Sequence, residues 1–353
     1  MSSKISALDG VRALALLNVL ILHAVSIFFP KTSPYISGMA QFGVWLFFIL
    51  SAFLLTNRFF VTGFTYSGII SYLLGRTLRI IPVFALAVFA YSYGGLFSKE
   101  RILEVLTFKQ TYLHLWTIPV EYTFYFILPI FAYISIKVTE KYSAWHAVFI
   151  LVLIICIHQL FYPYTDFSNS GTMKWYIPVF LYGVMASCVF NKSKLKLGRK
   201  SADGIAITTV LACLALSPML IKHLNIVTAG GTSNKFVFYG PLFAVLVYAS
   251  CTTQGYFSKM MESKIMMSIG KWSFSIYLWH LLVMFKMSNG SKDNIIIFIL
   301  SIVASIGVGI ISFNVIEAPC ERFRHKIMNN INKIGHRKLA RKDMSGEAMN
   351  RNA

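Results

Sequence analysis

Long apolar runs dominate the chain, and its polar residues gather between them. The runs lie at about 10–29, 40–60, 80–97, 114–136, 145–163, 172–190, 204–221, 237–253, 272–288 and 293–315. A bilayer core about 30 Å thick needs about 20 apolar residues for each helical span. The pattern therefore predicts an all-α, polytopic membrane protein with about ten transmembrane helices.

The composition excludes an ordinary soluble domain. The 353 residues are 56% hydrophobic and only 13% charged, which leaves too little polar surface to face water. The first apolar run is longer than the hydrophobic region of a signal peptide, and no small-x-small cleavage site follows before Pro30. We expect this run to stay as the first span.

The net charge of +20 would also suit a nucleic-acid-binding protein. With the N-terminus inside, however, about 23 basic residues fall in inner segments and about 9 in outer ones, as the positive-inside rule requires. This sorting argues against nucleic acid as a partner and predicts that both termini are cytoplasmic.

The same pattern predicts a transmembrane domain over residues 1–320 and a basic cytoplasmic tail over 321–353. In the tail, Ile327, Ile331 and Ile334 recur at helical spacing. A short helix lying on the anionic inner leaflet is therefore expected there.

Ionisable residues inside the apolar runs mark a candidate site, because a charge within a bilayer is costly. At 1.5 Å per residue, His23 lies about 20 Å along the first span and Glu121 about 10 Å below the outer end of the fourth. A carboxylate beside a histidine fixes its tautomer and helps it to activate a hydroxyl group. We predict that His23 and Glu121 form a catalytic pair; the alternative is a structural hydrogen-bonded pair.

Three arginines are candidates for binding an anion. Arg12 lies eleven residues before His23, so both occupy nearly the same helix face about 16 Å apart. Alone, Arg12 could equally be a snorkelling anchor paired with Asp9. Arg76 and Arg79 lie one turn apart at the expected inner start of the third span. Guanidinium groups suit phosphate oxygens, although positive-inside anchoring explains this pair equally well.

Several further residues have both a structural and a functional interpretation. His280 lies about 12 Å into the ninth span and is either a core residue or part of the site. Trp116 and Tyr122 suit an aromatic belt or a sugar-stacking platform. The five cysteines lack paired metal-ligand spacing, so we expect buried apolar cysteines and no metal.

Six segments together carry a family signature. They are Leu8-Asp9-Gly10-Val11-Arg12-Ala13 with His23, the run from Gly43 to Phe53 that contains Ser51, Arg76 to Pro82, His114 to Tyr122, Tyr277-Leu278-Trp279-His280, and Glu317-Ala318-Pro319. These segments resemble the acyltransferase-3 family of bacterial integral-membrane acyltransferases, over about residues 5 to 325. Ala52 replaces the family's usual glycine, and Tyr122 replaces its common second acid.

The resemblance implies transfer of an acyl group, usually acetyl, from a coenzyme A thioester on the cytoplasmic side to a sugar hydroxyl. Acetyl-CoA would bind through its phosphates at Arg12, Arg76 and Arg79. His23 would be the general base or a transient acyl acceptor, oriented by Glu121. The substrate-binding or supporting residues would be Asp9, Ser51, Trp116, Tyr122, His280 and Glu317.

The acceptor implied by the resemblance is a surface polysaccharide, such as the O-antigen of lipopolysaccharide, or a lipid-linked glycan at the bacterial inner membrane. Some members carry a fused periplasmic domain for which this length leaves no room, so an oligomer or a separate periplasmic partner is expected. The main alternative is a proton-coupled transporter or glycan flippase that uses His23 and Glu121 as a proton relay. A structural or receptor membrane protein is a third class, and it would not need aligned buried charges.

Overall fold

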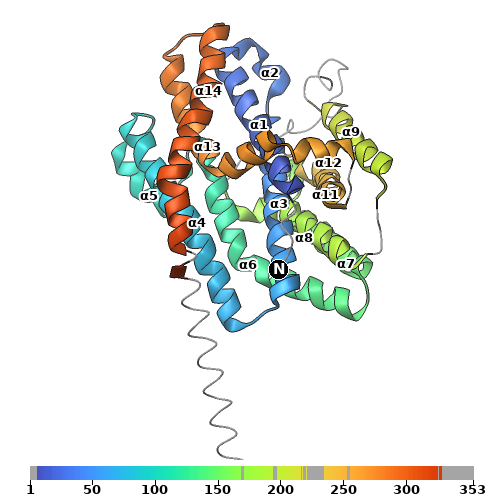
Figure 1. Ribbon diagram of the computed structural model, residues 1–353. Helices are drawn as coiled ribbons and strands as arrows, with labels where there is room; N and C mark the ends of the chain where they lie inside the picture. The colour runs from blue at the N-terminus through green and yellow to red at the C-terminus, as the bar shows by residue number, and fades with distance from the viewer. Residues whose placement is uncertain are drawn as a thin grey trace, which may run out of the picture.

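The protein is helical wherever its structure is described (Figure 1). The computed structural model describes residues 6–167, 171–193, 197–215, 217, 220, 234–252, 255–324 and 326–327, and no strand occurs within these ranges. The all-α fold class is therefore confirmed.

Each apolar run of the sequence overlaps one long helix. These helices are α1 (Ala7–Phe28), α3 (Ala40–Thr62), α4 (Tyr66–Tyr93), α6 (Thr117–Lys141), α7 (Ala144–Phe161), α8 (Ile177–Lys192), α9 (Arg199–Ala215), α11 (Phe236–Thr252), α13 (Lys264–Ser288) and α14 (Ile295–Ser312). The short helices are α2 (Ser33–Ile36), α5 (Ile102–Leu106) and α12 (Tyr256–Met261). Single 3-10 turns occupy Pro30–Thr32, Lys99–Arg101, Leu113–Trp116, Tyr164–Asp166 and Met173–Tyr176, and a π-helical turn, Phe313–Glu317, extends α14.

Within the described ranges, seven helical segments are long and apolar enough to cross a membrane. Four of them are the helices α1, α3, α4 and α7. The other three are α6 and α8, each with the 3-10 turn that precedes it, and α14 with its extension to Arg324. Helices α9 and α11 have 17 residues each, and α13 carries three lysines that lower its mean hydropathy. The described part of the chain is thus a polytopic helical protein with seven spans by this measure, and the predicted count of ten spans is not confirmed.

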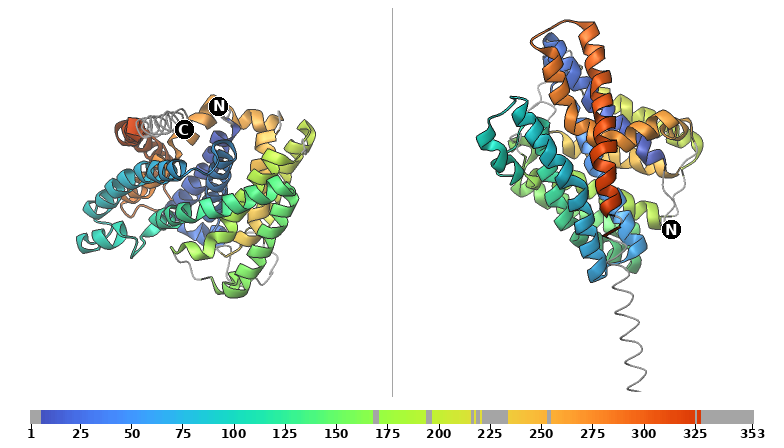
Figure 2. Two further views of the ribbon diagram at one scale, coloured as in Figure 1. Left: turned by 90° about the horizontal axis from the view of Figure 1, so that it is seen from below. Right: turned by 60° about the vertical axis from the view of Figure 1, so that its left-hand side comes forward.

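Helix α1 lies in the middle of the bundle, packed between α3 and α13 (Figures 1 and 2). Helix α14 packs on α13, and α8 packs on α3. The α13–α14 turn and α2 lie at one end of the molecule, and the α3–α4 and α6–α7 turns lie at the other (Figure 1). The two helices joined by each of these turns, α3 and α4, α6 and α7, and α13 and α14, therefore run in opposite directions, as in a protein that threads repeatedly through a bilayer.

Glycines allow these helices to approach closely. A Cβ atom on Gly43 of α3 would lie 2.2 Å from the Ala15 carbonyl oxygen of α1, and the Gly43 amide donates a 3.0 Å hydrogen bond to Asn18 Oδ1. A Cβ atom on Gly183 of α8 would lie 2.8 Å from the Cβ of Ala52. Small residues at such crossings give membrane helices their packing energy. Ala52, which departs from the family pattern, is accommodated because glycine faces it.

Helix α4 begins earlier than the sequence predicted. It starts at Tyr66, where the Thr65 side chain accepts a hydrogen bond from the backbone, and it continues through Pro82 to Tyr93. An internal proline is tolerated in membrane helices because neighbouring groups satisfy the freed carbonyl. Arg76 and Arg79 consequently lie inside the helix, not at its inner start as predicted.

The predictions for the cysteines and for the C-terminal tail have different outcomes. Cys188 is buried, but Cys156 on α7 is exposed, so the expectation that all five cysteines are buried is wrong. Facing away from the bundle costs an apolar thiol little where the surroundings are lipid. In the tail, Ile331 and Ile334 lie outside the described residues.

Candidate active site

Three arginines from two helices line one cavity, which we call the arginine cavity. Helix α1 contributes Arg12, helix α4 contributes Arg76 and Arg79, and the volume is about 90 Å³. The other lining residues are Val44, Phe47, Phe48, Ser51, Ile80, Thr117, Ile118, Glu121, Tyr125, Ser273, Phe274 and Tyr277. The structure therefore brings together the three guanidinium groups that the sequence placed on separate spans.

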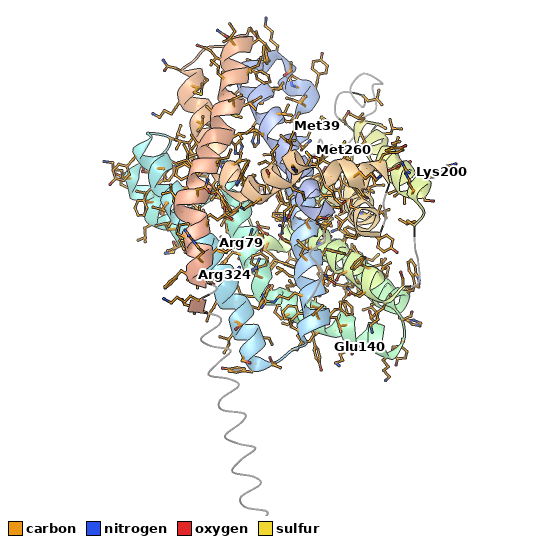
Figure 3. All side chains as sticks on the ribbon, viewed as in Figure 1. Met39, Arg79, Glu140, Lys200, Met260 and Arg324 are labelled. Carbon is orange, nitrogen blue, oxygen red and sulfur yellow. The ribbon has the colours of Figure 1, made fainter. Side chains whose placement is uncertain are left out.

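Two carboxylates orient two of these arginines. Arg12 Nη1 donates to Asp9 Oδ1 at 3.2 Å, so the predicted Asp9–Arg12 pair is present. Arg79 Nη2 lies 3.9 Å from Glu317 Oε1 in the π-helical turn that extends α14, and Figure 3 labels Arg79 in this part of the molecule. The other oxygen of Glu317 accepts a 2.7 Å hydrogen bond from Ser275. Asp9 and Glu317 thus fix the positions of the two arginine side chains that line the cavity.

Arg76 is held differently. Its guanidinium carbon lies 6.0 Å from the centre of the Tyr125 ring. Its Nε is buried and has no hydrogen-bond partner in the described part of the chain. An unsatisfied buried donor costs about 1–3 kcal/mol, so an anion in the arginine cavity would gain from pairing with it.

Glu121 belongs to the arginine cavity. Its Oε1 accepts hydrogen bonds from Ser51 on α3 and from Tyr125 one turn further along α6. The predicted direct pair of His23 and Glu121 is therefore wrong. Depth along a helix follows from counting residues, but the direction of a side chain around the axis depends on how the helices pack.

A second and larger cavity, which we call the histidine cavity, has a volume of about 440 Å³. Its lining residues are Leu22, His23, Ser26, Ile27, Ser33, Ile36, Ser37, Gly38, Ala40, Gln41, Val44, Leu113, His114, Trp116, Tyr277, Leu281 and Phe285. Many of them belong to the connection between α1 and α3, which Met39 marks in Figure 3. This cavity therefore lies toward the end of the molecule that carries α2.

A chain of hydrogen bonds fixes the tautomers of two histidines. His280 Nδ1 lies 2.7 Å from the Tyr277 carbonyl oxygen, which can only accept, so a neutral His280 carries its proton on Nδ1. Its Nε2 lone pair then accepts the 2.8 Å hydrogen bond from His23 Nδ1. A neutral His23 is left with a lone pair on Nε2, as a general base requires. His280, not Glu121, is the partner that orients His23.

His114 is a site residue that was missed as a candidate, although it lies in a quoted motif. It is 4% exposed, and its ring packs edge-on against His280 at 4.7 Å between centroids. His114 Nε2 lies 3.3 Å from the Leu278 carbonyl oxygen. Tyr277 and Tyr125 were also missed as candidates. The available signal was a tyrosine one helical turn from a predicted site residue, His280 or Glu121.

The two aromatic candidates separate in the structure. Trp116 lines the histidine cavity and stacks on Tyr176 with a ring separation of 5.0 Å. Tyr122 lies beside Thr77, with its hydroxyl 3.0 Å from Thr77 Oγ1, and packs against Phe108. Consecutive helical residues point about 100° apart, which turns Tyr122 away from the cavity that Glu121 lines.

The site thus combines a cationic cavity with a second, larger cavity that the His23 imidazole lines. In the ranges that the structure describes, no group of three or more His, Cys, Asp or Glu side chains could hold a metal ion. A family model described as "Acyltransferase domain" matches residues 5–313. The chain belongs to the acyltransferase-3 family. The resemblance seen in its motifs is confirmed, and the protein carries an acyltransferase domain.

Curated relatives agree with this assignment. A Staphylococcus aureus (strain COL) protein named "Putative O-acetyltransferase" is 22% identical over 368 residues, covering 92% of this chain and 58% of the relative. O-acetyltransferase OatA of Staphylococcus aureus (strain NCTC 8325 / PS 47) is 21% identical over 356 residues, covering 89% of this chain and 57% of the relative. The chain therefore spans less than two thirds of the length of these relatives. No solved structure matches the chain.

Proposed function

We propose that the protein is a membrane O-acetyltransferase that moves an acetyl group from cytoplasmic acetyl-CoA to a hydroxyl of a surface polysaccharide or lipid-linked glycan. The observation that carries this proposal is the meeting of two cavities: Val44 and Tyr277 line both the arginine cavity and the histidine cavity. In this proposal the chain crosses the bacterial inner membrane ten times, with both termini in the cytoplasm.

The arginine cavity suits the donor. Coenzyme A carries several phosphate charges, and planar guanidinium groups bind phosphate in a bidentate manner. Arg12 and Arg79 are held by Asp9 and Glu317, and Arg76 offers a buried Nε that lacks a partner among the described residues. The phosphates would lie at these arginines, with the thioester directed toward Tyr277.

The histidine cavity suits a polyhydroxylated acceptor. Ser26, Ser33, Ser37 and Gln41 line it with hydrogen-bonding groups. Trp116 contributes an aromatic ring, a surface on which sugars can stack. An acceptor glycan, such as the precursor of an O-antigen, would enter from the end of the molecule that carries α2.

The chemistry is a single acyl transfer. The acceptor hydroxyl gives its proton to His23 Nε2 while its oxygen attacks the thioester carbonyl. The carbon–sulfur bond breaks, and the departing coenzyme A thiolate takes the proton from His23. His280 holds His23 in the required tautomer through the 2.8 Å hydrogen bond. Glu121 keeps Ser51 and Tyr125 in place and offsets part of the arginine charge.

The test is acyl transfer by the purified protein in lipid nanodiscs. Acetyl-CoA and acceptor glycan should yield free coenzyme A and a glycan heavier by one acetyl group, and His23→Ala should form both products at least about a hundredfold more slowly. Mass spectrometry of surface glycans from cells with and without the protein gives the same comparison in vivo. Proton-coupled movement of glycan without any acylated product would instead favour a transporter.

Two mechanisms of transfer predict different intermediates. A general base leaves no acyl group on the enzyme, whereas a nucleophilic His23 would carry an acyl group on Nε2 after the thioester bond breaks. Rapid denaturation near neutral pH, after mixing with labelled acetyl-CoA and no acceptor, distinguishes them, because an acyl-imidazole, which acid would hydrolyse, then labels the peptide that contains His23.

A further inference from the structure

Two side chains are common to the arginine cavity and the histidine cavity. Tyr277 on α13 lines both, and so does Val44 on α3. One turn before Tyr277, Phe274 lines only the arginine cavity; one turn after it, Leu281 lines only the histidine cavity. Helix α13 thus passes from one cavity to the other at Tyr277.

Tyr277 is fixed at both ends of its side chain. Its hydroxyl accepts a 3.0 Å hydrogen bond from Thr117 Oγ1 and donates a 2.9 Å hydrogen bond to the His114 carbonyl oxygen. Its ring packs edge-on against Phe47, with centroids 6.3 Å apart, and against His114 at 5.1 Å. Tyr277 is only 6% exposed, so its ring is packed between the two cavities that it lines and acts as a wall between them.

We propose that Tyr277 is the specificity-determining residue that sets the size of the acyl group reaching His23 and keeps water of the histidine cavity away from the donor thioester. This inference rests on the proposed function, because it takes the arginine cavity as the donor site and the histidine cavity as the acceptor site.

The geometry allows the Tyr277 ring to respond to the donor without disturbing the base. The two hydrogen bonds of its hydroxyl both go to the segment 114–117, at the start of α6. Its carbonyl oxygen, in contrast, accepts the proton on His280 Nδ1. An acyl group entering from the arginine cavity can displace the ring while the backbone still fixes the tautomers of His280 and His23.

Size selection follows from the volumes of the two cavities. The arginine cavity is about 90 Å³ and the histidine cavity about 440 Å³, so the smaller cavity and the Tyr277 ring that lines it, not the acceptor side, limit the acyl chain. In a packed apolar site, one methylene group changes selectivity by about tenfold or more. A tyrosine wall against valine therefore favours acetyl over longer acyl groups.

The wall also prevents a wasteful reaction. Without it, a water oxygen attacks the thioester carbonyl, the carbon–sulfur bond breaks, and the proton released goes to the sulfur. The products are a free carboxylic acid and coenzyme A thiol. The experiment measures this hydrolysis as thiol release by the purified protein in nanodiscs, with acyl-CoA and no acceptor, for acetyl, butyryl and hexanoyl donors.

Tyr277→Ala should raise acetyl-CoA hydrolysis about tenfold and shift selectivity toward butyryl-CoA by about tenfold, since several methylene-sized groups are removed. Ile265→Ala is the matched control on the same helix. Ile265 is 72% exposed and lines neither cavity, so hydrolysis should stay at the wild-type level. Tyr277→Phe keeps the ring and should also keep hydrolysis low.

Val44, the other residue that lines both cavities, allows a second and independent test. Val44→Ala should change hydrolysis and selectivity in the same direction as Tyr277→Ala. If Tyr277→Ala does not fold, Val44→Ala tests the proposed wall in its place. Unchanged hydrolysis and unchanged selectivity in the folded wall variants, alongside normal acetyl transfer by the wild type, would overturn the role of Tyr277. Absence of transfer by the wild type with acceptor present would count against the proposed function instead.

Discussion

His23 Nδ1 and His280 Nε2 are 2.8 Å apart, and their rings are inclined by only 4°. Helices α1 and α13, which carry them, are separated by more than two hundred residues yet pack directly against each other. A single proton lies between these two nitrogens. If both nitrogens were protonated, their N–H groups would point at each other and repel. In the proposed reaction, His280 supplies the orientation that a carboxylate supplies in other histidine bases.

His280→Ala should therefore lower the rate of acetyl transfer by about a hundredfold, the lower end of what a positioned base contributes. Acetyl-CoA affinity should stay unchanged, because His280 lies outside the arginine cavity. Steady-state kinetics and direct donor binding measure the two effects. His158→Ala on α7, whose ring contacts the Lys174 carbonyl, is the control and should transfer normally. A loss of donor affinity equal to the loss of rate would contradict this assignment.

Glu121→Gln and His23→Ala should act independently. Glu121 is bonded to Ser51 and Tyr125, and His23 is bonded to His280, so the free-energy effects of the two substitutions should add within about 0.5 kcal/mol. Glu121→Gln and Ser51→Ala, in contrast, remove the same hydrogen bond and should be non-additive. Activities of the single and double variants test both cycles. A His23–Glu121 double variant no worse than either single variant would restore the direct pair.

The sequence predicted the helices and the members of the site better than it predicted their pairing. Apolar runs of spanning length fix where membrane helices form, since each helix satisfies its own backbone. Ionisable residues within them must face the bundle interior, and for that reason Arg12, Glu121 and His23 all line cavities. These predictions depend on one dimension, the position along the chain.

Pairing depends on how each helix is rotated and which helices are neighbours. Glu121 and His23 lie at similar estimated depths, yet Glu121 points to Ser51 and His23 points to His280. The contact between α1 and α13 joins the first and ninth predicted spans, which no local pattern indicates. The early start of α4 was missed because polar residues before Arg76 interrupt the apolar run.

Each of Arg12→Ala, Arg76→Ala and Arg79→Ala should weaken acetyl-CoA binding, because each removes a cation from the donor cavity. We expect the largest loss for Arg76, about tenfold, since a charge-assisted hydrogen bond is worth about 1.5–3 kcal/mol. Lysine should only partly substitute, and the alanine variants should show a weaker dependence of affinity on salt. Calorimetry in nanodiscs measures the acetyl-CoA affinity of the alanine variants, that of the lysine variants, and the dependence of affinity on salt.

The control for the arginines is Arg101→Ala, an exposed residue in the turn before α5, which should bind acetyl-CoA like the wild type. Glu317→Gln should weaken donor binding only while Arg79 is present, because Glu317 acts through it. Wild-type affinity in all three cavity variants would remove the arginines from the donor site.

Gly43→Ala should destabilise the protein by about 1–3 kcal/mol, because the added methyl group overpacks the α1–α3 crossing. Its Cβ would lie 2.2 Å from the Ala15 carbonyl oxygen, so one helix must move. Gly307→Ala on α14 is the matched control: its Cβ would meet no heavy atom within 4 Å, and alanine is the better helix former. Thermal unfolding in one detergent compares them. Equal midpoints for both variants would show that the crossing relaxes freely.

The basic residues predict how the helices are oriented in the membrane. Alternating helix directions place the α3–α4 and α6–α7 turns at one end of the molecule (Figure 1), and about 23 of the basic residues fall in segments assigned to that side. The positive-inside rule then puts this end, and the entrance for a cytoplasmic donor, in the cytoplasm.

Single cysteines in a background with the native cysteines replaced test this orientation with a membrane-impermeant maleimide. Thr62→Cys, at the end of α3 beside the α3–α4 turn, and Ser143→Cys, in the α6–α7 turn, should react only after the membrane is opened. Ser291→Cys, in the α13–α14 turn, should react in intact cells, because this turn lies at the opposite end of the bundle (Figure 1). The reverse labelling pattern would place the arginine cavity's end outside, where no cytoplasmic acetyl-CoA could reach it, and would exclude the proposed direction of transfer.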